Sequence, residues 1–421
     1  MKFTKYKLGE LLRITRGASL PGTGYADEGR YLRLTLANFH EEGGFKDFKS
    51  TQGKYFIEPF DSRFLMHKGN LITPLTEQSP GLLGSVAFIP CDDLYIQSQD
   101  VGLITCNTEK LDKTFAYYLF LTHSVREQIS ARSQQTKIRH TSPDKIADVE
   151  VYIPDLPTQL RIAGVLGSID EKIELNRKKI AELEALAKTI YDYWFVQFDF
   201  PDKNGKPYKS SGGKMVWNDQ LKREVPEGWE VGTVGDYVEI HRGASPRPIQ
   251  DFLSSTGLRW LKISDATNAT SPFVFHIEDH ILKEGLKNTV FLRAGDLVLS
   301  NSASPGIPKF LGVDSCIHDG WLYFPRSRLS KVFLYLFFEK YREALVPQGN
   351  GSVFKNLKTD ILRIFPMIKS TDYVLKRFNA VAEPIFDRIK TTAESTIVLS
   401  KHRESLLPLL MNGQVVVRGN K

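Results

Sequence analysis

Two stretches of this 421-residue chain hold basic side chains and no carboxylates. They are residues 11–26 and 240–250, and both contain the tetrapeptide Arg-Gly-Ala-Ser. A cation that no nearby carboxylate neutralises is available to bind the phosphates of a nucleic acid. The residues expected to make such contacts are Arg13, Arg16, Ser19, Arg242, Ser245 and Arg247. A purely structural tight turn is an equally good interpretation of the tetrapeptide, because its glycine permits close approach of two backbones.

A second pair of acid-free windows, residues 128–143 and 344–359, lies later in each half of the chain. Their amide side chains carry the donor and acceptor that pair with an adenine edge. The candidate contacts are Arg132, Gln134, Lys137, Arg139, His140, Lys355, Asn356 and Lys358. Lys309, which follows a Ser-Pro-Gly turn, is a further candidate. An ordinary solvated turn is the alternative for any single one of these residues.

The paired windows belong to an internal repeat. Residues 8–19 align with 234–245, residues 30–34 with 259–263, and residues 68–72 with 294–298, always in the same order. A Ser-Pro-Gly turn follows in both copies. Repetition of this kind sets the architecture, so we predict one structural unit used twice.

Each copy begins with a globular α+β domain. Short apolar runs between Gly, Pro and Asp predict strands, and longer apolar runs predict one helix in each copy. The predicted strands of the first copy are residues 31–36, 71–73, 86–89 and 101–104, and the predicted helices are residues 115–130 and 331–345. We expect these globular domains to span residues 1–157 and 229–367.

A long helix is predicted after each globular domain, over residues 158–200 and within residues 368–421. Thr158 is a suitable N-cap for the first helix. Apolar side chains alternate at spacings of four and three, which is typical of a coiled-coil seam. The predicted seam is Ile162, Leu166, Ile169, Ile173, Asn176, Ile180, Leu183, Ile190, Ile385, Ile389, Leu399 and Leu406.

The two seams share a constant offset of 216 residues, so helix length itself is expected to matter. Asn176 and Thr392 are polar interruptions at equivalent positions, interpreted either as register-fixing or as surface-facing, and Arg403 breaks the second seam. We expect the helices to pack as an antiparallel coiled coil with pseudo-twofold symmetry. Residues 201–228, rich in Gly, Pro, Lys and Ser, are expected to form the linker.

Composition and motifs exclude several other classes. Hydrophobic residues at 41% are enough for folded cores, and the longest apolar run is too short for a membrane span. Three cysteines without Cys-x-x-Cys spacing indicate neither a disulfide framework nor a zinc site, which fits a reducing cytoplasm. Gly213-Lys214 lacks the rest of a P-loop, and His276 and His280 lack further metal ligands. We therefore expect neither catalytic residues nor a cofactor or metal in this chain.

Over its whole length the sequence resembles the specificity subunit of type I restriction-modification systems. The resemblance rests on Ile153-Pro154 to Gln159, on the segment from Phe198-Asp199-Phe200-Pro201 to Tyr208, on Pro226-Glu227-Gly228-Trp229, and on Leu406-Leu407-Pro408 to Gly413-Gln414. The second copy departs from the pattern, because no glutamine follows Pro366 at the corresponding place. This difference puts a partner contact of the second helix in doubt.

The resemblance implies a non-catalytic DNA-binding subunit of a host-defence system. Each recognition domain would read one half of a bipartite site on double-stranded DNA, and the helices would act as a ruler. Two adenine methyltransferase subunits would dock on it, and restriction and translocase subunits would complete the enzyme. S-adenosylmethionine, ATP and Mg²⁺ would then belong to those partners. The alternatives are the recognition half of a fused restriction or methylation enzyme and a coiled-coil scaffold with repeated ligand-binding domains.

Overall fold

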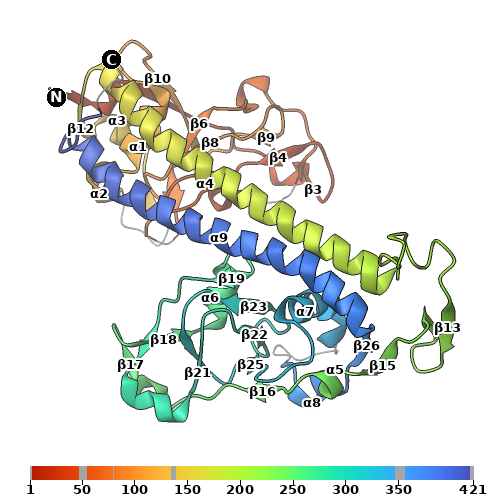
Figure 1. The fold of residues 1–421 in the computed structure, drawn as a ribbon. Coiled ribbons are helices and arrows are strands. Elements are labelled where there is room, and N and C mark those ends of the chain that lie inside the picture. The colour runs from red at the N-terminus through yellow and green to blue at the C-terminus, as the bar shows by residue number, and fades with distance from the viewer. Residues whose placement is uncertain (1, 47–54, 79, 134–138, 347–355, 418–421) are drawn as a thin grey trace. The chain divides into compact units, whose positions relative to one another are not determined.

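The computed structural model describes residues 2–46, 55–78, 80–133, 139–346 and 356–417, and these form two compact units. One unit comprises residues 1–171 and 399–421, and the other comprises residues 172–398. Helices α4 (Leu156–Tyr191) and α9 (Asp372–Met411) each contribute one part to each unit (Figure 1). Each unit is thus a recognition domain with a segment of both long helices.

The first recognition domain contains two four-stranded sheets. The first sheet has the order β2 (Leu12–Arg16), β10 (Val101–Cys106), β6 (Leu71–Pro74), β8 (Ala87–Phe88) and is antiparallel throughout. The second has the order β3 (Tyr25–Ala26), β5 (Tyr55–Phe56), β4 (Tyr31–Arg33), β9 (Tyr95–Ile96), and its β4–β9 pair is parallel. Helices α1 (Lys113–Phe120), α2 (His123–Ala131) and α3 (Pro143–Ala147) complete it.

The second recognition domain repeats this topology and extends each sheet by one strand. One sheet has the order β16 (His241–Arg242), β25 (Trp321–Tyr323), β22 (Leu297–Ser300), β23 (Pro308–Leu311), β19 (Phe273–Val274). The other has the order β17 (Leu253–Ser254), β20 (His280–Ile281), β18 (Leu258–Leu261), β24 (Ser315–Ile317), β21 (Val290–Leu292). Its helices are α5 (Val234–Tyr237), α6 (Ile263–Asn268), α7 (Lys331–Leu345) and α8 (Thr359–Ile364). The repeat inferred from sequence is confirmed by matching strand orders.

A two-stranded antiparallel sheet closes each recognition domain. In the first domain β1 (Thr4–Lys7) pairs with β12 (Glu150–Ile153), and in the second β15 (Glu230–Thr233) pairs with β26 (Pro366–Lys369). The chain therefore leaves each domain beside the point where it began. A further pair, β7 (Thr76–Glu77) with β11 (Arg139–His140), lies within the first domain.

The prediction of one continuous helix over residues 115–130 is wrong. Residues 115–130 form α1 and α2 with a break at Leu121 and Thr122, whereas α7 has the predicted bounds. Thr122 adopts an extended backbone, and its hydroxyl donates to the Leu119 carbonyl at 2.7 Å. A hydroxyl that satisfies a carbonyl at a helix end competes with continuation of the helix.

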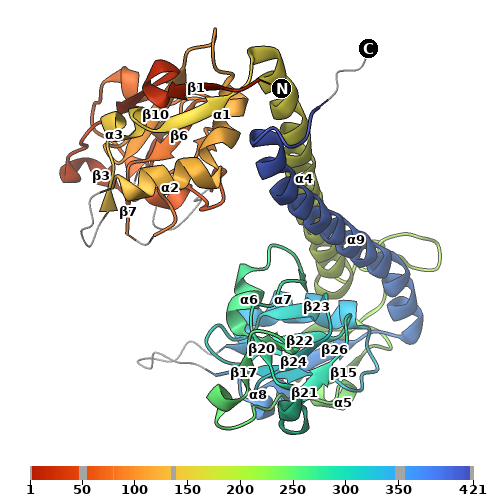
Figure 2. The same ribbon diagram turned by 90° about the vertical axis from the view of Figure 1, so that its left-hand side faces the viewer.

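The long helices run antiparallel within each unit and lie side by side in both views (Figures 1 and 2). In the first unit Ile162 and Leu166 share a core with Leu406 and Leu410. Every residue of the predicted seam is buried or partly buried. The alternating spacing therefore identified the packed face of both helices correctly.

The polar interruptions of the seam are buried as well. Asn176 is 5% exposed and Thr392 is 7% exposed, so the surface-facing interpretation is wrong for both. The Thr392 hydroxyl donates to the Arg388 carbonyl at 2.7 Å. The Asn176 amide nitrogen has no hydrogen-bond partner among the residues that the structure describes, which is an unfavourable arrangement in a packed interface.

A polar cluster anchors the first recognition domain on its helix segments. The Tyr118 hydroxyl of α1 donates to the Asp170 carboxylate of α4 at 2.7 Å, and Arg403 of α9 pairs with the same carboxylate at 3.0 Å. Arg403 and Asp170 side chains are only 20% and 27% exposed. Arg403 breaks the apolar pattern because it supplies this ion pair.

The second domain is anchored by aromatic packing and charge together. Helix α7 places Phe333 against Tyr191 of α4 and Phe378 of α9, with ring centroids 5.4 and 6.1 Å apart. The Tyr335 hydroxyl donates to Glu184 of α4 at 3.1 Å, and Lys188 of α4 pairs with Glu339 of α7 at 2.9 Å. Helix α7 thus contacts both long helices.

The start of each long helix is fixed from the recognition domain. Asp155 caps α4 by accepting from the Thr158 amide, so the predicted cap at Thr158 is wrong. Gln159 is fully buried, donates to the Lys110 carbonyl at 2.9 Å and accepts from the Asp112 amide at 3.0 Å. This glutamine therefore makes an internal contact.

In the second copy, a residue at a different position links the long helix to the recognition domain. Ser330 caps α7 as Asp112 caps α1, and its hydroxyl donates to Asn379 of α9 at 2.8 Å. In the aligned repeat Asn379 lies one helical turn beyond the place of Gln159. The second long helix is therefore linked to its recognition domain even without the glutamine.

Residues 201–228 are more structured than their composition predicted. They contain the hairpin β13 (Met215–Asn218) and β14 (Arg223–Pro226), and Tyr208 stacks on Phe200 at 4.6 Å. Arg377 of α9 donates to the carbonyls of Pro201 and Asp202 at 3.1 and 3.0 Å. The connection is held against the second helix.

We predict that Arg403→Ala lowers the free energy of unfolding by about 1–3 kcal/mol, because it leaves a half-buried carboxylate without its cation. Arg388→Ala, at an exposed position of the same helix, should change it by less than about 0.5 kcal/mol. Denaturant unfolding of the full chain measures both. Equal losses in the two variants would show that the ion pair is no anchor.

Candidate functional site

The Arg-Gly-Ala-Ser segment has the same backbone role in both domains. It follows an edge strand, where Arg16 lies opposite Gly102 and Arg242 lies opposite Leu322. A Cβ atom at Gly17 would lie 2.3 Å from the Gln97 carbonyl oxygen. A Cβ atom at Gly243 would lie 2.2 Å from the His318 carbonyl oxygen. The glycine is thus required by packing, whereas the arginine before it is exposed.

In the first domain the arginines of β2 are exposed on opposite faces. Arg13 and Arg16 are three residues apart in a regularly paired strand, and successive side chains alternate between faces. Neither side chain has an ion pair or hydrogen bond to the residues described in the structure. The structure brings Arg16 together with exposed Ser19 at the turn and separates Arg13 from them.

In the second domain the corresponding residues gather around Asp319. Arg242 donates from Nε to the Asp319 backbone carbonyl at 2.5 Å, and its Nη2 lies 3.6 Å from the carboxylate. The Ser245 hydroxyl donates to Oδ1 at 2.6 Å, and Arg247 Nη2 lies 3.5 Å from Oδ2. The predicted contacts Arg242, Ser245 and Arg247 therefore form one cluster.

This cluster borders a cavity of about 880 Å³ between the tetrapeptide turn and the turn after β24. The lining includes Gln250, Trp260, Lys262 and His318. The hydrogen bond from Ser245 lowers the pKa of the Asp319 carboxyl, against the effect of partial burial, and the nearby Arg242 lowers it further. Burial lowers the pKa of His318, whose Nδ1 accepts from the Gly320 amide at 2.8 Å. Lysine and arginine therefore supply the positive charge of the cavity.

Asp319 was not among the residues selected from the sequence. The selection rested on windows without acids, and this carboxylate lies 74 residues beyond Ser245 in the chain. The structure shows that the turns after β9 and β24 are equivalent, because each packs against an Arg-Gly-Ala-Ser glycine.

Two predicted contacts have structural roles instead. Arg139 pairs with buried Glu77 at 2.8 Å and also donates to Ser130 and Ser133. The other oxygen of Glu77 accepts from the backbone amides of Gly81, Leu82 and Leu83, so the pair organises that loop. Lys309 donates to the carbonyls of Ala269 and Ser271 at 3.2 and 2.6 Å, and burial lowers its pKa.

The remaining candidates are spread over the second acid-free windows. Arg132 is partly buried and donates to the Gln128 carbonyl at 3.2 Å, at the end of α2. His140, Asn356 and Lys358 are exposed. Gln134, Lys137 and Lys355 lie outside the described residues.

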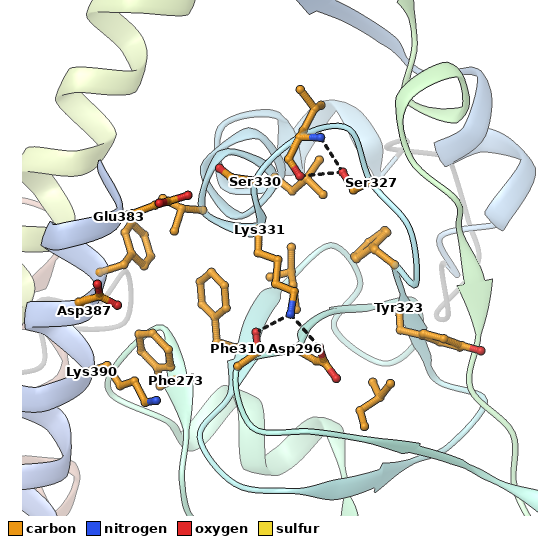
Figure 3. Close-up of a pocket in the computed structure, with 18 of the residues that line it drawn as sticks. Phe273, Asp296, Phe310, Tyr323, Ser327, Ser330, Lys331, Glu383, Asp387 and Lys390 are labelled. Carbon is orange, nitrogen blue, oxygen red and sulfur yellow. Dashed lines mark hydrogen bonds and ion pairs between the residues drawn. The ribbon is translucent and has the colours of Figure 1, made fainter. Parts of the chain in front are cut away.

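A second hollow, of about 690 Å³, lies between the second domain and α9 (Figure 3). Phe273 and Phe310 form its floor, and Glu383 and Asp387 of α9 face it. Lys331 crosses the hollow to pair with Asp296 at 2.8 Å. Lys390 of α9 also lines the hollow, so both signs of charge surround it and it is no cluster of unneutralised cations for a phosphate.

Over the described ranges no cluster of three or more His, Cys, Asp or Glu residues could hold a metal ion. A search of the same residues finds no helix that is both long and apolar enough to cross a membrane.

Comparisons with known proteins agree with this architecture. Residues 1–185 match the family model of the type I restriction modification DNA specificity domain. The type I restriction enzyme MjaIX specificity subunit of Methanocaldococcus jannaschii is 24% identical over 310 residues, which cover 72% of this chain and 69% of that protein. The HindI specificity subunit of Haemophilus influenzae is 22% identical over 414 residues, covering 85% of this chain and 89% of that protein.

The fold is also similar to a solved structure, the type I restriction-modification system S subunit from M. genitalium. The TM-score is 0.57 at 15% identity, over 100% of this chain and 97% of that chain. Two α+β domains, each with a segment of two long helices, define the class of fold. Residues 1–185 match the specificity domain, and over most of its length the chain is similar to the specificity subunits of type I restriction-modification systems.

We predict that Gly17→Ala and Gly243→Ala each destabilise the protein by about 2–3 kcal/mol, because the new methyl group would overlap a backbone carbonyl. Gly22→Ala is the matched control, since a Cβ there meets nothing within 4 Å. Thermal unfolding of the three variants tests this. A Gly22 variant as unstable as the other two would contradict the packing role.

Proposed function

We propose that this chain is the non-catalytic subunit that gives a type I restriction-modification enzyme its DNA sequence specificity. Each recognition domain reads one half of a bipartite site on double-stranded DNA. The observation that carries the proposal is an exposed arginine at the same backbone position of both domains, Arg16 and Arg242, directly before a glycine that packing requires. A common position with different surroundings suits two readers of different half-sites.

The long helices support a spacing role. Helix α4 has 36 residues and α9 has 40, or roughly 54 and 60 Å at 1.5 Å per residue. Their seams are buried in register, so an insertion of one residue would rotate everything beyond it by about 100°. We propose that this fixed length sets the separation of the two half-sites.

The partners are expected to bind the exposed parts of the chain. We propose that two adenine methyltransferase subunits dock on the helices, and that restriction and translocase subunits join the assembly. S-adenosylmethionine, ATP and Mg²⁺ would be bound by those subunits. Exposed apolar side chains on the first helix, Leu160, Leu175 and Leu186, support a docking role, because they lie outside the helix seam.

We predict that DNA from a host carrying this chain with its methyltransferase subunits contains methylated adenines in one bipartite motif with a spacer of fixed length. Methylation-sensitive sequencing gives the motif directly, and a host without the chain is the control. A purified chain that methylates or cuts DNA alone would favour the fused-enzyme alternative. Salt-insensitive binding to protein or glycan, without DNA binding, would favour the scaffold alternative.

We also predict that Arg16→Ala weakens DNA binding of the methyltransferase-bound complex, and that the dependence of log K on log salt becomes shallower by about 0.9. Arg13→Ala is the matched control, because Arg13 lies on the same strand but on its opposite face, where the second domain has Glu239. Titration of target DNA at several salt concentrations measures both. A larger effect of Arg13→Ala would reverse the assignment of the DNA-facing side.

A further inference from the structure

The cluster around Asp319 has an electrostatic arrangement that differs from a phosphate site. Arg242 and Arg247 both approach the Asp319 carboxylate, at 3.6 and 3.5 Å. A phosphate placed on either guanidinium would meet this carboxylate as a neighbouring like charge. A neutral base edge would not be repelled in this way, so the arrangement favours a base over the backbone.

The orientation of the Arg242 side chain also favours a base over a phosphate. Its Nε and Nη2 edge faces residue 319, whereas Nη1 has no partner among the described residues. The two η-nitrogens therefore remain able to donate together at the end of the side chain. Two parallel donors from one guanidinium match the O6 and N7 acceptors of guanine in the major groove.

Asp319 is itself held firmly. Its Oδ1 accepts from Ser245, and its backbone carbonyl accepts from the Asn301 amide at 3.2 Å as well as from Arg242. Asn301 is 4% exposed. A fixed carboxylate orders the arginine before DNA binds, which reduces the entropy lost on binding.

The first domain lacks this arrangement. Where the second domain has Asp319 in the turn after β24, the first has Ser98 in the turn after β9, and Ser98 is 1% exposed. Among the residues that the structure describes, no carboxylate pairs with Arg16. The two domains share the arginine position but not its support.

We propose that Arg242, oriented by Asp319, reads a guanine in the half-site of the second recognition domain. This proposal rests on the proposed function of the chain. Arg242 is the base-reading residue, and Asp319 is a positioning residue that acts through it. The first domain has no equivalent pair, so the effect of these residues is confined to one half-site.

The test is methylation-sensitive sequencing of host DNA with the complete complex, for the wild type and for Arg242→Lys, Asp319→Asn and Asp251→Asn. Lysine keeps the charge but loses the bidentate geometry, and Asp319→Asn keeps the size but loses the carboxylate. Asp251 is an exposed acid next to the cavity residue Gln250, so its variant controls for a change in net charge.

We expect Arg242→Lys and Asp319→Asn to relax the same guanine position in one half-site, with at least roughly tenfold lower discrimination against other bases in DNA binding by the purified complex. The other half-site and the Asp251→Asn motif should be unchanged. Thermal unfolding of each variant checks that its fold is retained.

Three results would overturn the proposal. They are an unchanged motif in both variants, a uniform loss of affinity at every position, and relaxation of the same position by Asp251→Asn. The proposed function fails by a different outcome, namely the absence of any bipartite methylation motif in the wild type.

Discussion

The ion pair between Asp170 and Arg403 is the interaction on which the first unit depends most. It joins segments 233 residues apart in the chain, and Tyr118 extends it into the recognition domain. A reading domain is useful only when it is held rigidly on its support, and a half-buried charge pair with a shared hydrogen bond provides direction as well as energy. In the second unit, edge-to-face aromatic rings and the pair between Lys188 of α4 and Glu339 of α7 hold the domain on the helices.

The sequence predicted the large features of the fold because they arise from periodicity. The helix seam, the repeat and the bounds of α7 all follow from patterns of apolar residues. Features that depend on a single long-range contact were not predictable. Arg403 interrupts the apolar seam because it pairs with Asp170, and Gln159 is buried against Asp112; neither partner follows from the sequence spacing.

In the candidate site, too, the features that follow from local sequence were predictable and those that depend on a long-range contact were not. The acid-free windows contain the Arg-Gly-Ala-Ser turns, whose arginines Arg16 and Arg242 are exposed. The second turn is not free of carboxylates in space, because Asp319 pairs with Arg242 and accepts from Ser245. The same criterion included Arg139, because it could not detect that Glu77 pairs with this arginine. Lys309, chosen for its place after a Ser-Pro-Gly turn, donates to two backbone carbonyls instead. A search for windows without Asp or Glu could not have found Asp319, because it rejects every carboxylate.

The two-stranded closures β1–β12 and β15–β26 have a consequence for how such a protein can change. Because each domain begins and ends at one antiparallel pair, its interior can be replaced without moving the helix that follows. In genetic terms, two crossovers placed in the codons of a closing pair would exchange one half of the recognised site and preserve the spacer. New specificities can then arise by recombination of whole domains, with no need for gradual substitution of contact residues.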